Sequence, residues 1–219
     1  MPELTTVQQI AIWIIPVLFA VTIHEASHAW VANLCGDNTA KMMGRLTFNP
    51  VKHIDPIGTV IMPVLILVLS QFHFVFGWAK PVPINGAQLR HPRRDMALAT
   101  AAGPASNLLM VLFWAGCFKI ATYFNPQYSS PALFLLLASR AGIIINLLLA
   151  FFNLIPIPPL DGGRIAVSLL PLRQAMLLQK LEPYGFFILL ALLFSGALGW
   201  IIGPLINMSL NFLHFLFNI

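Results

Sequence analysis

The residues best suited to chemistry in this chain are two histidines and a glutamate at the end of an apolar run. His24, Glu25 and His28 lie in the stretch VTIHEASHAW, directly after the apolar run IAIWIIPVLF. On a helix, two histidines four residues apart point the same way, so His24 and His28 can bind one Zn²⁺ ion. Glu25 would stay off the metal and act as a general base toward a water molecule that the zinc activates. The spacing therefore predicts a zinc site with hydrolytic chemistry.

A catalytic zinc site needs a third protein ligand, and Asp161 is the best candidate. It follows the segment NLIPIPPL and precedes two glycines. The prolines interrupt a helix, and a carboxylate on unwound backbone at membrane depth is costly unless something binds it. The alternative is that Asp161 caps a helix that starts near Arg164. Glu182 is a poorer ligand candidate, because the neighbouring Pro183 disfavours a helical placement.

The composition indicates an integral membrane protein. Hydrophobic residue types make up 58% of the 219 residues and charged types only 9%, whereas a soluble domain carries about 25% charged residues. The net charge of +5 does not indicate nucleic-acid binding, because the 12 Lys and Arg residues are scattered through loops. Cations in loops at membrane borders are better explained as topology signals.

Several apolar segments must position the candidate residues, and a membrane-spanning helix needs about 20 such residues. The segments expected to cross or enter the membrane are 6–34, 57–77, 93–122, 131–155 and 184–219, the last as one long span or two short ones. Short β structure is expected in RLTF at 45–48, and a peripheral amphipathic helix at 164–182. The predicted fold class is an α-helical polytopic membrane protein with about four to six apolar segments and a small β or re-entrant region after the first span.

The positions of the cations favour a re-entrant 57–77 segment. If it crossed the membrane, the loops on one side would hold seven Lys and Arg residues and the loop on the other side three. If it dips in and returns, these ten share one face, and only Lys119 and Arg140 lie toward the other. The positive-inside tendency favours the second arrangement. The loops predicted to be cytosolic are 35–56, 78–95 and 156–183.

The chain contains three motifs: HEASH, the GPASN at 103–107 and the NLIPIPPLDGG at 153–163. Together they resemble the site-2 protease family of intramembrane zinc metalloproteases. The stretches GRLTFNPVKHIDPIG and GWAKPVPIN look like the short bacterial and archaeal branch that lacks an inserted PDZ domain. The resemblance implies one protease domain over 1–219, with its core at 6–163 and C-terminal helices at 164–219.

The resemblance implies hydrolysis of a peptide bond in or beside the transmembrane helix of a substrate protein. By position, the ligands of one Zn²⁺ ion would be His24, His28 and Asp161, with Glu25 as the base. Asn153 matches an asparagine that is expected to contact the substrate or the oxyanion, and Asn107 matches one expected near the site in a supporting role. For both asparagines, hydrogen bonding between helices is the alternative.

The resemblance also implies where the protein acts and on what. The expected location is the inner membrane of a prokaryotic cell, with the active site toward the cytosol, in agreement with the cation count. The expected partners are a transmembrane-helix substrate, the lipid bilayer, and a regulatory membrane protein or a second copy of the chain. A helical substrate must be locally extended before cleavage, and an edge strand within 45–50 or 78–84 would hold it by strand addition.

Two other classes of protein compete with this interpretation. One is a membrane zinc protease in which a glutamate on a later helix is the third ligand, and only Glu182 could serve here. The other is a non-catalytic zinc-binding scaffold or a transporter. Glu25 argues against it, because a pure binding site needs no free carboxylate between its ligands. A transporter is also expected to show repeated halves, which the sequence lacks.

Overall fold

The described part of the chain is built of helices joined by turns and irregular segments. The computed structural model describes residues 5–62, 65, 77, 79–126 and 130–218, and no strand occurs among them. In chain order the elements are α1 (Thr6–Leu34), α2 (Thr39–Met42), the 3-10 helix η1 (Pro50–His53), the π-helix η2 (Pro56–Ile61), α4 (Pro92–Tyr123), α5 (Ser130–Asn153), α6 (Asp161–Leu169), α7 (Leu172–Gln179), the 3-10 helix η3 (Glu182–Tyr184), α8 (Gly185–Phe194) and α9 (Ala197–Phe217).

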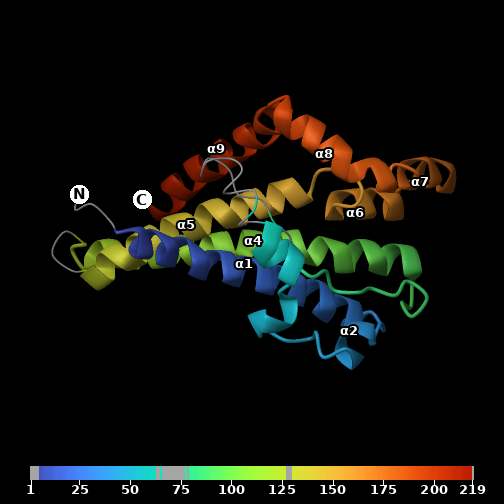
Figure 1. The fold of residues 1–219 in the computed structure, drawn as a ribbon, viewed down its shortest axis with the longest axis horizontal. Helices are drawn as coiled ribbons and strands as arrows, with labels where there is room; N and C mark the ends of the chain where they lie inside the picture. Colours follow the sequence, from blue (N-terminus) through green and yellow to red (C-terminus); the bar gives the residue numbers. More distant parts are fainter. Residues whose placement is uncertain (1–4, 63–64, 66–76, 78, 127–129, 219) are drawn as a thin grey trace.

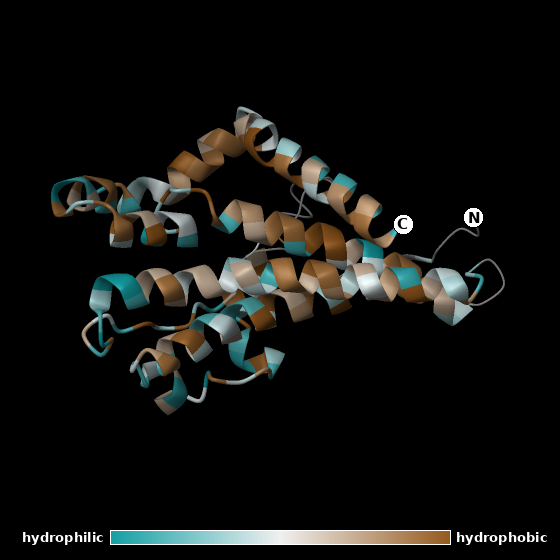
Figure 2. Cartoon of the chain, turned by 180° about the vertical axis from the view of Figure 1, so that it is seen from behind, coloured by the Kyte–Doolittle hydropathy of each residue, from teal (hydrophilic) through white to brown (hydrophobic). Residues whose placement is uncertain are grey.

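Five of the described helical segments are long and apolar enough to cross a membrane. They are Val7–Leu34, Pro92–Tyr123, Ser130–Asn153, Leu172–Phe194 and Ala197–Phe217. Apolar residues dominate α8 and the middle of the long helices, and hydrophilic residues gather toward their ends (Figure 2). This distribution matches the apolar core and polar borders of a bilayer. The prediction of an α-helical polytopic membrane protein is confirmed.

Helices α1, α4 and α5 pack against one another and form the body of the molecule (Figure 1). Trp114 of α4 packs with Leu147 of α5 and Leu213 of α9 in the largest buried apolar cluster. Gly142 of α5 allows this approach, because a Cβ atom there would lie 2.4 Å from the Trp114 ring. The close packing holds α4 and α5 in a fixed register, and α1 packs on both.

Helix α1 carries the histidine motif near its C-terminal end. At its start, Thr5 and Gln8 form a capping box, in which each side chain accepts a hydrogen bond from the other residue's backbone N–H. The helix has 29 residues, so it is about 44 Å long at 1.5 Å per residue. The chain reverses at Gly36, whose φ of +110° is costly for other residue types.

The segments that follow α1 and precede α4 meet at one end of the bundle. Arg90 donates its backbone N–H to the carbonyl oxygen of Cys35 at 3.0 Å. Asp37, which is fully buried, accepts the backbone N–H groups of Asn85 at 2.6 Å and of Thr39 at 2.9 Å. These contacts fasten residues 79–91 to the end of α1.

Most of the 57–77 segment lies outside the described residues, so the re-entrant prediction is tested only at its flanks. The backbone N–H of Lys80 donates to the carbonyl oxygen of His53 at 3.0 Å. The chain therefore leaves and returns at the same place. A re-entrant path requires such adjacent flanks, and it stays a prediction.

The β-strand expected at 45–48 does not form. Residues 45–48 are an irregular segment. Arg45 reaches residues 79–85 through its side chain, which donates to the carbonyl oxygen of Pro81 at 2.8 Å. A ladder between these segments is disfavoured because Pro81 and Pro83 have no N–H to donate. The prediction from the alternating RLTF pattern was wrong because no neighbouring segment in the described part of the chain can pair with it as a strand.

The C-terminal part differs from the sequence prediction in one respect. The single helix expected at 164–182 is two helices, α6 and α7, because Pro171 follows a residue with extended backbone. The alternative left open for 184–219 resolves to two helices that are separated by Gly196 in a left-handed conformation. Helix α9 returns to pack on α5 and α4, whereas α8 contacts α9 and η3. The two helices form a V beside the bundle (Figure 1).

Candidate functional site

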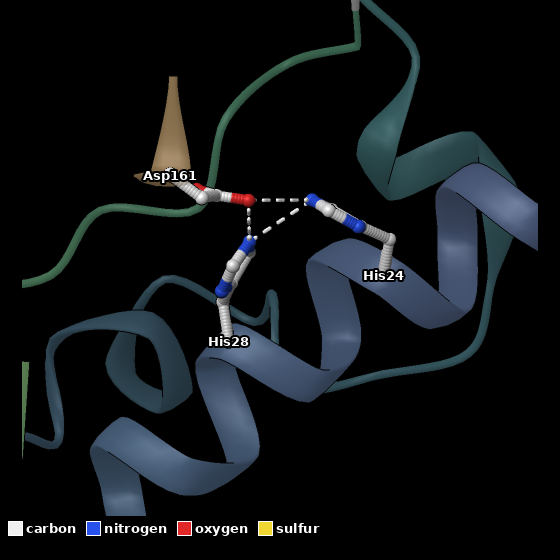
Figure 3. Close-up of side chains that lie close together, drawn as sticks. All are labelled: His24, His28 and Asp161. Carbon is white, nitrogen blue, oxygen red and sulfur yellow. Dashed lines mark hydrogen bonds and ion pairs between the residues drawn. The ribbon is translucent and has the colours of Figure 1, made fainter. Parts of the chain in front are cut away.

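Three side chains from distant parts of the chain converge at one point in the structure (Figure 3). The Nε2 atom of His24 lies 3.1 Å from Oδ2 of Asp161, and that of His28 lies 3.4 Å from the same oxygen. The two Nε2 atoms are 3.1 Å apart. Both histidines are buried, at 7% and 6% exposure. The structure thus brings together the three residues that the sequence analysis selected as metal ligands.

The outer nitrogen of each imidazole is held by a hydrogen-bond acceptor. Nδ1 of His28 lies 2.8 Å from the carbonyl oxygen of Ala99, which can only accept, so Nδ1 carries the proton. Nδ1 of His24 lies 2.6 Å from Oδ1 of Asn107 and donates to it. In the neutral imidazoles both Nε2 atoms are therefore unprotonated and point their lone pairs inward. Such outer partners are typical of metal-binding histidines.

This arrangement fits a bound metal cation better than it fits a hydrogen-bonded core. In these neutral tautomers, two imidazole lone pairs and a carboxylate oxygen face one another without a proton between them. No described residue donates a hydrogen bond to Oδ2 of Asp161, although the atom is buried. In a tetrahedral zinc site with bonds of about 2.0–2.1 Å, neighbouring ligand atoms lie roughly 3.3–3.4 Å apart. The observed distances of 3.1–3.4 Å are close to that value.

The backbone around Asp161 explains how its carboxylate reaches the histidines. Helix α5 ends at Asn153, and residues 154–160 form irregular turns that contain the prolines of the NLIPIPPL segment. A Cβ atom at Gly162 would lie 2.2 Å from the carbonyl oxygen of Leu154, and one at Gly163 would lie 2.2 Å from the Pro158 nitrogen. Only glycines let the first turn of α6 approach this loop so closely.

Asp161 is the first residue of α6 and not its cap. The N-cap is Leu160, which makes no side-chain capping hydrogen bond. The capping alternative therefore does not hold, and the carboxylate is directed at His24 and His28 (Figure 3). A carboxylate in the first helical turn is also favoured by the helix dipole.

Glu25 lies beside the triad in sequence and holds a second segment of the chain. Its Oε2 atom accepts the backbone N–H of Val82 at 2.8 Å. Val82 is buried against Ala29 of α1, and residues 79–85 have no regular secondary structure. The contact places the carboxylate between α1 and this segment.

A cavity of about 590 Å³ lies next to that segment. It is lined by residues 81–84 on one side and by α6, α7 and the loop before α6 on the other. The lining side chains include the apolar Val82, Met96 and Val167 and the polar Arg164 and Glu182. Glu182 lies in this lining and is not part of the triad, which removes the alternative in which it is the third ligand.

The two asparagines of the sequence analysis occupy different environments. Asn107 is fully buried behind His24, and its Nδ2 group donates to Oδ1 of Asn146 at 2.8 Å and to the carbonyl oxygen of Ala20 at 3.3 Å. Asn153 donates to the carbonyl oxygen of Leu149 on its own helix at 3.0 Å. The structure thus connects Asn107 with the triad and gives Asn153 a contact within α5.

Two residues that support the site were not selected from the sequence. Asn146 is fully buried in α5 and contacts Asn107. Its sequence signal is a polar amide in an apolar span, which is costly and often functional. Gly103 packs on the histidines so closely that a Cβ atom there would lie 2.4 Å from the His28 ring. It belongs to the GPASN motif, whose glycine the sequence analysis did not use.

Comparison with known proteins identifies the family of this chain. The sequence profile of peptidase family M50 matches residues 116–196. The protein named "Putative zinc metalloprotease YwhC" of Bacillus subtilis is 38% identical over 197 residues, which cover 89% of this chain and 85% of that protein. "Putative zinc metalloprotease Rip2" of Mycolicibacterium smegmatis is 30% identical over 185 residues, or 83% of this chain and 66% of that protein.

No solved structure matches the chain. The family is instead shown by the relative from Bacillus subtilis, which the chain matches over most of both lengths. The HEASH motif, the later LDGG motif and the convergence of their side chains agree with this assignment. The chain belongs to peptidase family M50, the family of site-2 zinc metalloproteases.

Proposed function

We propose that this protein is an intramembrane zinc peptidase that hydrolyses a peptide bond in or near the transmembrane helix of another protein. The observation that carries the proposal is the triangle of His24, His28 and Asp161 on helices of a membrane protein, with Glu25 next to the first ligand. In this proposal the three side chains bind one Zn²⁺ ion. Residues 1–219 act as one domain, with the site in its core at 6–163.

Each residue of the site has a separate role in the proposed reaction. A zinc ion bound at the triangle would polarise the scissile carbonyl and lower the pKa of a water molecule toward about 7. Glu25 takes a proton from the attacking water and passes it to the leaving amine. Asn107 and Ala99 keep the imidazoles in the tautomer that leaves Nε2 unprotonated. Burial of the histidines keeps bulk water away from the ligands.

The cavity beside residues 81–84 is the proposed binding site for the substrate. A helical substrate hides its scissile bond within its own hydrogen bonds, so it must be extended before cleavage. Residues 81–84 line the cavity and lie against Glu25 through Val82, so a substrate segment bound there would lie beside the proposed base. In this proposal Asn153 contacts the bound segment.

The proposed location is the inner membrane of a prokaryotic cell, with the site open toward the cytosol. Helices α2, α6 and α7 and the start of α4 lie at the end of the bundle that is opposite to both termini (Figure 1). Those segments and their flanking loops hold ten of the 12 Lys and Arg residues, and the other two are Lys119 and Arg140. The positive-inside tendency assigns this end to the cytosol. Regulation would come from a membrane partner or a second copy of the chain.

The direct test compares the parent protein with Glu25→Gln in detergent or vesicles. Zinc content and cleavage of a reporter transmembrane segment are measured for both. We expect both to bind zinc and only the parent to cleave, with cleavage lost on addition of a chelator and restored by zinc. Asp55→Asn is the matched control, because Asp55 accepts backbone N–H groups that an amide oxygen also accepts. Two zinc-loaded proteins that leave a panel of segments uncut would favour the non-catalytic scaffold.

A further inference from the structure

A chain of buried hydrogen bonds runs from the backbone of α5 to His24. The Nδ2 group of Asn146 donates to the carbonyl oxygen of Gly142 at 2.8 Å. Oδ1 of Asn146 accepts from Nδ2 of Asn107 at 2.8 Å, and Oδ1 of Asn107 accepts from Nδ1 of His24 at 2.6 Å. Both asparagines have no exposed surface, so no water competes for these groups.

The directions of the hydrogen bonds in this chain are set by two backbone carbonyl oxygens, those of Gly142 and Ala20. A carbonyl oxygen can only accept, so Gly142 fixes the Nδ2 group of Asn146 toward itself. The other end of that amide, Oδ1, then faces Asn107 and can only accept. Asn107 must therefore turn its Nδ2 group toward Asn146, where the carbonyl oxygen of Ala20 also accepts from it. What remains for His24 is an acceptor oxygen.

The acceptor behind His24 decides where its proton lies. With Oδ1 of Asn107 behind it, the neutral imidazole keeps its proton on Nδ1 and directs a lone pair at Asp161. If the Asn107 amide were reversed, an N–H group would face Nδ1. The proton would then move to Nε2, where it would point at the other two side chains of the triad and oppose a cation.

We propose that Asn146 is a positioning residue for the metal centre, because its oxygen, at 2.8 Å against 3.3 Å for the Ala20 carbonyl, is the closer of the two acceptors that fix the Asn107 amide and thereby the tautomer of His24. The inference rests on the proposed function only in assuming that the triad binds a cation. His28 provides an internal reference. Its Nδ1 donates to the backbone carbonyl of Ala99, which has no alternative orientation, so changes at position 146 leave the His28 tautomer unaltered.

The experiment measures tautomers and metal binding in two variants, one without and one with an acceptor at position 146. Asn146→Leu removes the acceptor that faces Asn107, and Asn146→Asp keeps one. Imidazole tautomers are read from ¹⁵N spectra of histidine-labelled, metal-free protein, and zinc affinity by competition with a chelator. In Asn146→Leu we expect His24 to gain the Nε2-protonated tautomer and zinc affinity to fall about 10- to 100-fold, as for other outer partners of metal ligands. Asn146→Asp should keep the parent tautomer.

Ser139→Ala is the matched control, because Ser139 is a fully buried polar residue of the same helix outside this hydrogen-bond chain. It should change neither the tautomers nor the zinc affinity. If Asn146→Leu does not fold, Asn146→Ala removes the same acceptor and replaces it.

Three results would overturn the inference. They are an Nε2-protonated His24 in the parent protein, an unchanged His24 in a folded variant that lacks the acceptor, and an equal response of His24 and His28. The tautomers are measured without metal or substrate. Failure of peptide cleavage would therefore contradict the proposed function but not this inference.

Discussion

At the scale of single residues, Asp161 is the side chain on which the triad most depends. Replacing it with alanine removes a direct ligand and leaves two imidazoles alone. We expect Asp161→Ala to lower zinc affinity by more than about 100-fold, since loss of an outer partner alone costs about 10- to 100-fold. Zinc content after gel filtration is the measurement, with Asp55→Asn as a control that keeps an acceptor for the backbone N–H groups at that position. Equal zinc in parent and variant would remove Asp161 from the ligands.

Asp37 gives the protein a predictable response to acid. Burial acts to raise its pKa, but hydrogen bonds from Thr39 and the backbone N–H of Asn85 prevail and lower it. A lowered pKa in the folded state stabilises the protein above the unfolded-state value of about 3.9, and this stability is lost as the pH falls through the folded-state pKa.

Asp37→Asn tests that response. The amide can accept only one of the two N–H groups well, so we expect a loss of about 1–3 kcal/mol at neutral pH. We also expect a flatter dependence of the unfolding midpoint on pH below about 4 than in the parent. Thermal unfolding in detergent at a series of pH values measures both. Identical pH profiles would mean that Asp37 does not stabilise the loop contact in this way.

The sequence predicted the three triad residues, because each departs from an apolar surrounding that penalises charge. Asn146 is likewise a polar residue in an apolar span, but it belongs to no recognised motif that would link it to His24. Its role depends on the packing of α4 on α5, which spacing along one helix does not encode. Glu25 was selected as a base, whereas its contact with Val82 depends on a segment more than fifty residues away.

At the scale of elements, the contact between α4 and α5 depends on a missing side chain. A Cβ atom at Gly142 would lie 2.4 Å from the Trp114 ring, whereas one at Gly116 would have no neighbour within 4 Å. We expect Gly142→Ala to destabilise the protein by about 1–3 kcal/mol, as overpacking usually does. Gly116→Ala is the control and should be neutral or stabilising by about 0.5–1 kcal/mol. Unfolding in detergent compares them, and equal midpoints would contradict the packing argument.

Helix α6 is held at both ends, by the triad at its start and by Arg93 at its end. The Arg93 guanidinium donates to the carbonyl oxygens of Ser168 and Leu170, which are left without helical partners at that terminus. We expect Arg93→Gln to let α6 move and to lower zinc affinity about fivefold, for a loss of about 1 kcal/mol. Arg94→Gln, with the same loss of charge, should have no such effect. A similar change in both variants would indicate a general effect of charge.

Elements whose formation depends only on their own sequence, such as the long apolar helices, were predictable. Elements that depend on contacts with other segments were less so. The long spans follow from unbroken apolar runs. The strand at 45–48 failed because its neighbour contains Pro81 and Pro83, which cannot complete a ladder. The break between α6 and α7 falls at Pro171, a signal that the amphipathic pattern on either side of it concealed.

At the scale of the whole molecule, the arrangement of segments predicts which surfaces share a side of the membrane. Single cysteines at Met43 and Gln88, in a chain whose two native cysteines are replaced, should react with a membrane-impermeant reagent from the same side. A cysteine at Tyr123, at the other end of α4, should react only from the opposite side. All three native side chains are exposed. Labelling of 43 and 88 from opposite sides would rule out the re-entrant path for 57–77.

The two histidines of the triad differ in how a mutation can reach them. The group behind His28 is a peptide carbonyl, which every sequence that folds α4 supplies regardless of the residue at position 99. The group behind His24 belongs to a side chain and depends in turn on a second one. The positions behind the two histidines should therefore differ in the substitutions that they tolerate, although the two histidines lie at similar distances from Asp161. A single side-chain change at Asn107 or Asn146 can alter the acceptor behind His24, whereas no side-chain change removes the backbone acceptor behind His28.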